Sequence, residues 1–410
     1  MRDPKMNAAA IQSVEPRRLR RIALDAQGLL RNAPFGRGRS GAQKAIEHLG
    51  YVQIDTISVV ERAHHHTLWA RVPNYRQVHL EQLVRAGKVF EYWAHAAAYL
   101  PMRDYRFALP RMHDYASGQT RWVRSRDKKL MSAVLRRIEQ EGPLRARDFE
   151  TPKGHKGGWW AWKPAKRALE QLFMEGRLMI AGREGFEKIY DVPERVLTDD
   201  IDTTMPSPDE QAAHLVDSTI RAFGFAQSKE CVYHRRGHEI RKDVNRVLRA
   251  RVDAGALVEL RCKEGDGTYF ASPEVLERSA PRTQSRVSLL CPFDNVLIQR
   301  DRGKRIHDFD YQLECYVEAH KRRYGYFCLP ILYRDEFIGR MDCKADRKDR
   351  VFIVQALHFE EGLRDLEAVL EPLSETVSDY ATFNGCDRIR VVRVEPRATL
   401  AQAKRALEDQ

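Results

Sequence analysis

Apolar residues recur at helical spacing near the start of the chain, between residues 16 and 33. A second, shorter helix is predicted from Ala42 to Leu49, and Gly50 follows it as a suitable C-cap. Tyr51 to Val60 is rich in Val, Ile and Thr, so we expect a strand there. Helix, helix and strand in this order are typical of a winged helix.

The same order of elements recurs twice further along the chain. Between residues 130 and 192, the pattern predicts a helix that stops at Gly142, a short helix, a third helix from Lys163 to Glu175, and a hairpin around Gly185. Two more helices between residues 211 and 260 precede a hairpin around residues 264–267. Such units are common in α+β proteins, but three in tandem within a basic chain favour a nucleic-acid scaffold.

The composition changes to short apolar runs separated by charged turns from about Ser288 onward. Repeated short strands of this kind indicate a small barrel or a curled sheet. A final helix is predicted from Leu363 to Phe383. The fold class expected from the pattern is therefore α+β.

Charge and composition narrow the possible partners. The chain has 410 residues, enough for two to four domains, and a formal net charge of +12. An excess of this size favours nucleic acid or an anionic membrane surface, although many soluble proteins are somewhat basic. No apolar run is long enough to span a bilayer and the N-terminus has no secretory pattern, so we expect a cytoplasmic protein. The seven cysteines are scattered, which predicts reduced thiols and no zinc or redox pair.

The segment YVQIDTISVV carries the first candidate chemistry. Side chains alternate faces along a strand, so Gln53 and Asp55 are expected to project from the same face. An amide beside a carboxylate can hold a water molecule and can face a developing cation. The alternatives are a polar, solvated strand face or an aspartate that opens a turn.

Three consecutive histidines, residues 64–66, follow this segment. Neighbouring side chains diverge on a helix or a strand, so these cannot readily bind one metal ion, and no metal or cofactor is expected. His65 and His66 are candidates for DNA contact, with a solvated turn as the alternative.

Further candidate DNA contacts are basic clusters. The third helix of the second unit carries one set, which is expected to face a groove: Lys163, Lys166 and Arg167. Two sets lie in the last third of the chain, one around a turn at Gly303 and one before Tyr324 and Tyr326: Arg300, Arg302, Lys304 and Arg305; Lys321, Arg322 and Arg323. A solvated charged face is the alternative for these last two sets.

Several linear motifs together resemble one family. They are GYVQIDTI, EYWAHAA, GGWWAWKPAKRALEQLF, CPFDNVLIQRDR, and FDYQLECYVEAHKRRYGYFCLPIL with the later GRMD. In combination they are similar to the winged-helix DNA glycosylases of the YcaQ and AlkZ type, which repair interstrand crosslinks. The resemblance runs from about Arg17 to near the C-terminus and is loosest over residues 200–285.

The resemblance implies three tandem winged-helix (helix-turn-helix) domains followed by a small β-barrel-like domain, clasping duplex DNA as a monomer. A disordered lead is expected at residues 1–16. The three winged helices are expected at 17–125, 126–198 and 199–280, and the first of them carries the catalytic strand. The C-terminal domain with its helix is expected at 281–410. The family's Gln-x-Gln or Gln-x-Asp motif falls on Gln53 and Asp55, and the aspartate indicates the YcaQ branch. A hairpin around Arg300 to Arg305 is expected to approach the lesion.

The implied activity is monofunctional hydrolysis of N7-alkylated purines, including crosslinked guanines. An N7-alkylated guanine is already cationic and leaves without protonation, so the enzyme has to stabilise the sugar cation and deliver water. A crosslinked base cannot rotate freely out of both strands, so we expect an exposed site rather than a deep pocket. The rival hypotheses are a non-catalytic winged-helix regulator, which needs no acid at position 55, and a metal-dependent nuclease.

Overall fold

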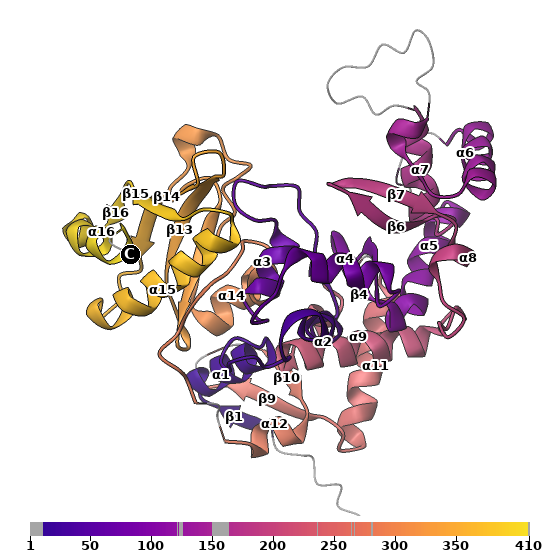
Figure 1. The fold of residues 1–410 in the computed structure, drawn as a ribbon. Coiled ribbons are helices and arrows are strands. Elements are labelled where there is room, and N and C mark those ends of the chain that lie inside the picture. Colours follow the sequence, from indigo (N-terminus) through magenta and orange to yellow (C-terminus); the bar gives the residue numbers. More distant parts are fainter. Residues whose placement is uncertain are drawn as a thin grey trace, which may run out of the picture.

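The computed structural model describes residues 11–120, 122, 126–149, 164–235, 237–263, 265, 267–279 and 282–408. It is a mixed α+β structure whose strands form four separate sheets in these ranges. In Figure 1, the second helix–hairpin unit and the C-terminal domain lie on either side of the first unit, with the third unit beneath them. No helix in the described ranges is long and apolar enough to cross a membrane.

The first unit places the candidate strand. Its helices are α1 (Pro16–Ala26), α2 (Gly38–Leu49), α3 (Ala63–Trp69) and α4 (Gln77–Arg85). Its sheet has the order β2 (Val52–Gln53), β4 (Ala97–Pro101), β3 (Val89–Trp93). Helix α2 ends as predicted at Gly50, whose φ of 80° suits a residue without a Cβ. The strand predicted from Tyr51 to Val60, however, is only two residues long.

The second unit contains the predicted helices and hairpin. Its elements are η1 (Met102–Ala108), α5 (Leu109–Ser117), α6 (Lys128–Glu141), β5 (Leu144–Arg145), η2 (Ala146–Asp148), α7 (Pro164–Met174), β6 (Met179–Glu184), β7 (Glu187–Asp191) and α8 (Pro193–Val196). Strands β6 and β7 pair antiparallel across Gly185, which confirms the predicted hairpin. The predicted helix Lys163–Glu175 is confirmed as α7, although Lys163 itself lies outside the described residues.

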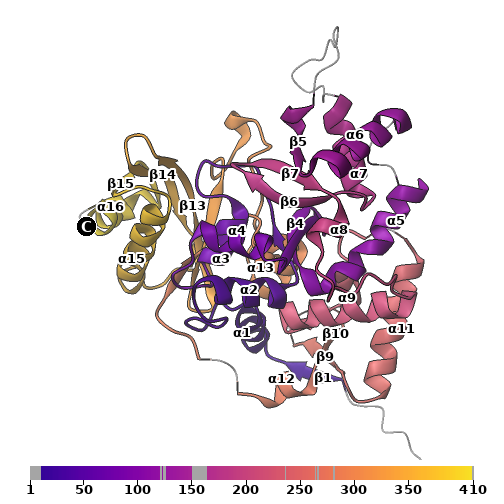
Figure 2. The same cartoon turned by 45° about the vertical axis from the view of Figure 1, so that its right-hand side comes forward.

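The third unit packs beneath the first. It contains α9 (Pro208–Phe223), β8 (Phe225–Ala226), α10 (Ser228–Cys231), α11 (Glu239–Asp253), β9 (Val258–Cys262), β10 (Tyr269–Ala271) and α12 (Pro273–Glu277). Helix α9 contacts α1 and α2 (Figure 2). The third sheet also contains β1 (Gln12–Val14), which pairs parallel to β9. Residues 12–14 therefore belong to a sheet rather than to the disordered lead expected at 1–16.

The C-terminal domain is an open sheet. Strands β11 (Val287–Leu289), β12 (Cys328–Tyr333), β13 (Glu336–Asp346), β14 (Val351–Phe359) and β15 (Arg388–Val391) lie in that order, and β16 (Val394–Glu395) pairs with β14. Its helices are α13 (Asn295–Ile298), α14 (Arg300–His307), η3 (Ala319–Lys321), α15 (Glu367–Phe383), η4 (Arg397–Thr399) and α16 (Leu400–Glu408). β11 and β15 remain at opposite ends of the path, so within the described ranges the sheet does not close into a barrel.

Helix α3 joins the first unit to the C-terminal domain. His66 contacts the Leu289 carbonyl oxygen through Nε2 at 3.0 Å and the Tyr380 hydroxyl through Nδ1 at 2.9 Å. Because a carbonyl can only accept, Nε2 carries the proton and the Tyr380 hydroxyl donates to Nδ1. Arg71 makes a fully buried bidentate pair with Asp294 at 2.7 Å for each bond. These contacts hold helix α3 against the C-terminal domain.

Candidate active site

The candidate strand ends in a turn. Val52 and Gln53 pair with Tyr99 and Ala98 of β4. Asp55 lies beyond the strand, and its Oδ1 accepts a hydrogen bond from the Ile57 backbone N–H at 2.7 Å. An aspartate that accepts from the residue two positions ahead forms an Asx turn, so the chain leaves the sheet here. The aspartate that opens a turn, considered above as an alternative, is therefore part of the structure.

Gln53 is held by His95. The side chain of Gln53 is 7% exposed, and its Oε1 lies 2.7 Å from His95 Nε2. His95 lies in the turn between β3 and β4, and its ring meets that of Tyr51 edge-on at 5.1 Å. Burial and the nearby cations His234, Arg111 and Arg300 lower the pKa of His95 to about 4.

His95 is therefore neutral near pH 7, and one of its ring nitrogens carries the proton. Since the amide oxygen of Gln53 can only accept, the donor in this contact is His95 Nε2–H. The contact fixes the carboxamide of Gln53 and leaves its NH₂ group to donate to another atom. The amide is thus buried against a polar partner rather than in an apolar core.

Asp55 is half-buried between two parts of the molecule. Burial raises its pKa above the ordinary value, against the lowering effects of the Ile57 N–H group and the Arg62 guanidinium. Burial raises the pKa of Cys315 and of Tyr316, and the charge of Asp55 adds to both effects, so these residues of the C-terminal domain lie close to it. Tyr316 is 79% exposed. The carboxylate therefore lies between the start of α3 and an exposed aromatic ring.

Arg62 is held by the hairpin of the second unit. Its guanidinium lies 3.8 Å from the centre of the Phe186 ring, and the Arg183 guanidinium lies 4.4 Å from the same ring. Arg183 pairs in turn with the buried Glu91 at 2.8 Å. The hairpin tip is therefore packed against the first unit near Asp55.

Two of the predicted DNA contacts are wrong because they are buried. His66 is 0% exposed and makes the two internal hydrogen bonds described above. Arg302 is 1% exposed and pairs with Glu230 at 2.8 Å. Both side chains join domains. His65 is half-buried, and its Nδ1 lies 2.8 Å from the Tyr75 hydroxyl.

The expected hairpin from Arg300 to Arg305 is also wrong, because these residues form helix α14. A Cβ at Gly303 would lie 3.0 Å from Leu297, so this glycine permits close packing and marks no turn. Arg300 is half-buried and Arg305 pairs with Glu230, whereas Lys304 is exposed and pairs with Asp310 at 2.8 Å.

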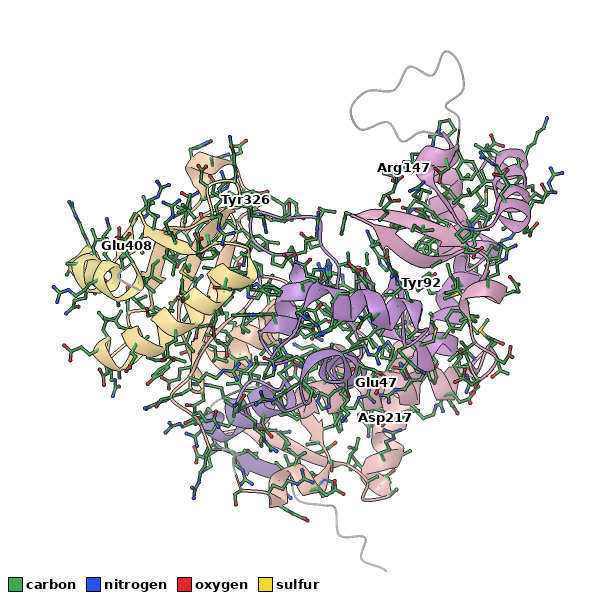
Figure 3. The ribbon with its side chains drawn as sticks, in the orientation of Figure 1. Glu47, Tyr92, Arg147, Asp217, Tyr326 and Glu408 are labelled. Atoms are coloured by element: carbon green, nitrogen blue, oxygen red, sulfur yellow. The ribbon has the colours of Figure 1, made fainter. Side chains whose placement is uncertain are left out.

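The remaining basic residues lie nearer the surface. Lys166 and Arg167 are exposed on α7. Lys321 and Arg323 are exposed, and Arg322 lies over the Tyr326 ring at 4.9 Å. In Figure 3, Tyr326 and Arg147 lie on opposite sides of the first unit, one on the C-terminal domain and one on the second unit. These residues stay predictions as DNA contacts.

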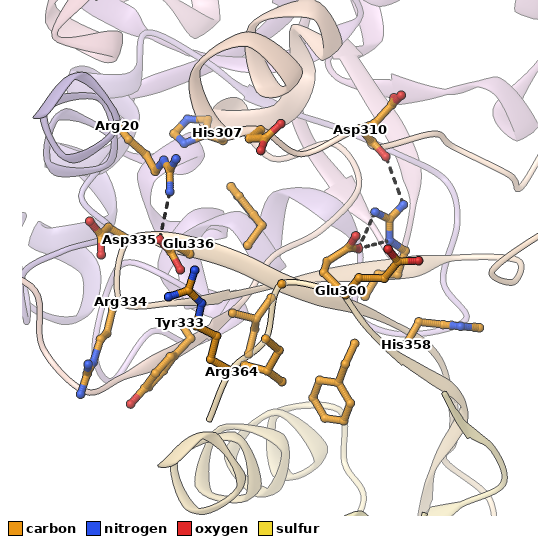
Figure 4. Close-up of a pocket in the computed structure, with 18 of the residues that line it drawn as sticks. Arg20, His307, Asp310, Tyr333, Arg334, Asp335, Glu336, His358, Glu360 and Arg364 are labelled. Carbon is orange, nitrogen blue, oxygen red and sulfur yellow. Dashed lines mark hydrogen bonds and ion pairs between the residues drawn. The ribbon is translucent and has the colours of Figure 1, made fainter. Parts of the chain in front are cut away.

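A large cavity lies elsewhere. It has a volume of about 1150 Å³ and lies where α1 and the α14–β12 segment face β13. Figure 4 shows its mixture of acidic and basic side chains, including the pairs Arg20–Glu336 at 3.4 Å and Arg340–Glu360 at 2.7 Å. Neither Gln53 nor Asp55 lines it. Among the described residues, no three of His, Cys, Asp and Glu are placed to hold a metal ion.

The comparison with protein families decides the assignment. The model of the AlkZ-like DNA glycosylase family matches residues 46–376. The chain belongs to this family. The members of this family are DNA glycosylases, which are repair enzymes. At the level of the family, the substrate of this protein is therefore DNA.

A solved structure shows the same fold. The DNA glycosylase AlkZ of Streptomyces sahachiroi superposes with a TM-score of 0.63 at 16% sequence identity. The match covers 93% of this chain and 100% of that one. The AlkZ-like fold expected from the linear motifs is thus confirmed.

Sequence reasoning missed several residues around Gln53. They are Tyr51, Arg111, His234, Arg235 and Tyr316. His95 is part of a motif used for the resemblance, but nothing in the sequence links it to Gln53. Only the pairing of β2 with β4 brings residue 53 beside the turn that carries residue 95.

Proposed function

We propose that this protein hydrolyses the N-glycosidic bond of N7-alkylated purines in duplex DNA, as a monofunctional glycosylase, and that it unhooks interstrand crosslinks. The observation that carries the proposal is a fixed amide followed, two residues further along the chain, by a half-buried carboxylate. Gln53 is bonded to a neutral His95 at 2.7 Å, and Asp55 follows two residues later. Both lie within the part of the chain that matches the glycosylase family.

The two groups divide the chemistry. The N7-alkylated base leaves as a neutral molecule, so positive charge develops on the sugar and no acid is required. The ionised carboxylate of Asp55 stabilises this charge and accepts a proton from the attacking water. Its raised pKa makes it a stronger base than an ordinary aspartate. The free NH₂ group of Gln53 donates to the water oxygen and orients it toward the C1′ carbon.

The position of Asp55 suits a crosslinked substrate. The carboxylate lies past the end of a strand, beside an exposed Tyr316, and does not line the large cavity between α1 and β13. An enzyme that reaches the sugar without enclosing the base can act when that base is tied to the other strand. We therefore include crosslinks in the substrate class, with the three helix–hairpin units acting as winged helices that hold the duplex.

The experiment compares Asp55→Asn with the wild type on duplexes that carry N7-methylguanine or a nitrogen-mustard crosslink. We expect base release to fall by about 100-fold or more, with DNA affinity kept or raised, because a single catalytic group is removed. Asp253→Asn, at an exposed position at the end of α11, is the matched control and should keep full activity.

Three outcomes would contradict the proposal. Unchanged release by Asp55→Asn would remove the carboxylate from the mechanism. No release by the wild-type protein would favour a DNA-binding regulator. Strand cleavage that stops in EDTA, in place of abasic sites that form in its presence, would favour a nuclease.

A further inference from the structure

Three arginines and a histidine surround His95. Burial lowers the pKa of His95 most, and the electrostatic effects of His234, Arg111 and Arg300 lower it further, in decreasing order. The ring of His234 lies 6.1 Å from that of His95. Arg235 follows in sequence, and the charge of Arg111 acts on it. The four cationic residues Arg111, His234, Arg235 and Arg300 are called the His95 cluster below.

The arginines of the His95 cluster form no ion pair with a carboxylate in the described part of the chain. Arg111 donates to the carbonyl oxygens of Trp93 at 3.2 Å and Ala94 at 2.7 Å. Arg300 donates to those of Leu297 at 2.9 Å and Pro292 at 2.6 Å. These carbonyl groups accept hydrogen bonds from the guanidinium N–H groups, but they do not neutralise the positive charge of the two arginines. Burial and Arg111 lower the pKa of Arg235 to about 10, which shows how unfavourable its environment is for a charge.

A small cavity lies beside His95, lined by two of the four cluster residues. Its volume is about 120 Å³, and His95, Arg111 and Arg235 are among its lining residues. This is several times the volume of one water molecule, about 30 Å³, so a tetrahedral anion fits. His234 beside it is exposed, so the cavity is reached from solvent.

Two acidic residues also line this cavity, and both have cationic partners of their own. Glu230 binds Arg302 at 2.8 Å and Arg305 at 2.5 Å. Asp104 lies 3.9 Å from Arg103 and is also influenced by Arg221. Neither acid is therefore left to neutralise Arg111 or Arg235.

We propose that the His95 cluster is a phosphate-binding site, and that its ligand is a phosphodiester group of the DNA strand beside the scissile nucleotide. A phosphate supplies the negative charge that the cluster lacks, and guanidinium groups bind its oxygens in a fixed geometry. His95 links the site to Gln53, so a phosphate bound here places the adjacent sugar relative to the amide. The position beside the scissile nucleotide rests on the proposed function; the phosphate site itself does not.

The first test measures how binding depends on salt. Each phosphate contact contributes roughly 0.9 to the slope of log affinity against log salt concentration for duplex DNA. We expect Arg235→Gln to lower this slope by about that amount on an undamaged duplex, and Arg235→Lys to restore part of it. Arg405→Gln, at an exposed position on α16, is the matched control and should keep the wild-type slope. Wild-type slopes in both Arg235 variants would overturn the proposal.

The second test locates the phosphate. Single phosphates around an N7-methylguanine are replaced by uncharged methylphosphonates, and the affinity of each duplex is measured. For the wild type we expect a loss of about 10-fold to 100-fold at one phosphate next to the lesion, the scale of one charged hydrogen bond. That loss should disappear in Arg235→Gln. The same position-dependent losses in wild type and variant would overturn the assignment.

Free inorganic phosphate could bind the same site in place of a DNA phosphodiester. A third measurement therefore distinguishes these two ligands. If millimolar phosphate raises the melting temperature of the wild type but not of Arg235→Gln, and the methylphosphonate scan is flat, the ligand is a free anion and the DNA assignment is wrong. All three measurements report binding. A protein that passes them without releasing any base would refute the proposed function and leave the phosphate site intact.

Discussion

Two sets of buried or half-buried arginines differ in what neutralises them. In the first set, each arginine faces a carboxylate from a distant part of the chain: Arg71 binds Asp294 through two bonds of 2.7 Å, and Arg302 binds Glu230 at 2.8 Å. In the second set, the His95 cluster, Arg111 and Arg300 donate to backbone carbonyl groups, and Arg300 also lies 4.7 Å from the centre of the Tyr311 ring. The first set joins domains, and the second surrounds the candidate catalytic amide.

The difference shows how one residue type serves both stability and binding. A buried charge is tolerated when a partner of opposite sign lies against it. Where the protein needs an arginine for its architecture, the chain itself supplies that partner. Around His95, Asp114 acts on Arg111 only from beyond ion-pair distance, and no described carboxylate forms an ion pair with the three arginines, so their charge remains available to a ligand.

The largest effect is expected from breaking an architectural pair. Arg71→Met leaves Asp294 buried without a partner and should lower the free energy of unfolding by about 3–5 kcal/mol. Urea denaturation measures this change. The double variant Arg71→Met/Asp294→Leu should recover most of the loss, because no unpaired charge remains. Equal losses in the single and double variants would show that packing, not charge, makes the contribution.

A smaller effect is expected at His95, and on catalysis rather than stability. His95→Ala frees the carboxamide of Gln53 and should lower the rate of base release by about 10-fold, the scale of one hydrogen bond, with little change in KM. His95→Gln, which can still donate to Gln53, should recover part of the rate. Single-turnover assays separate the two parameters, and an effect on KM alone would argue against a positioning role.

Arg235→Met tests the second set directly. Removing an arginine that has no carboxylate partner should change the free energy of unfolding by less than about 1 kcal/mol, or raise it, in contrast to Arg71→Met. The same urea denaturation measures both. A loss as large as that of Arg71→Met would place Arg235 among the architectural arginines.

The smallest effect concerns pH. Burial raises the pKa of Asp55, so its ionised form is less stable in the folded protein than in the unfolded chain. Asp55→Asn should therefore be slightly more stable than the wild type near pH 7. As the pH falls through the raised pKa of Asp55, the wild-type carboxyl takes up a proton and the difference should disappear. Thermal denaturation from pH 7 to pH 4 measures it, and a difference that grows toward low pH would contradict the shift.

Local signals in the sequence predicted local structure well. The caps and apolar spacing of α2 and α7, and the hairpin across Gly185, depend on neighbouring residues and were confirmed. The strand through Asp55 was wrong because the aspartate bonds to its own backbone, which no apolar pattern reveals. Helix α14 was missed because Gly303 permits close packing within a helix and not a turn.

The candidate site likewise contains residues that the sequence could relate to each other and residues that only the fold brings together. Gln53 and Asp55 are close in sequence and could be paired on that basis. The contact between Gln53 and His95 depends on strand pairing over 42 residues, and the buried state of His66 and Arg302 depends on partners in other domains. The histidines and arginines that bind ligands cannot be distinguished from those that join domains until these distant partners are known.

The pairing of β1 with β9 has a consequence for synthesis on the ribosome. Strand β1 comprises residues 12–14, whereas its partner comprises residues 258–262. Some 240 residues must be made before the first strand finds its place, and contacts of such long sequence separation form slowly. The start of the chain therefore waits as an exposed strand edge while the first two units emerge, so it is open to nascent-chain chaperones until late in translation.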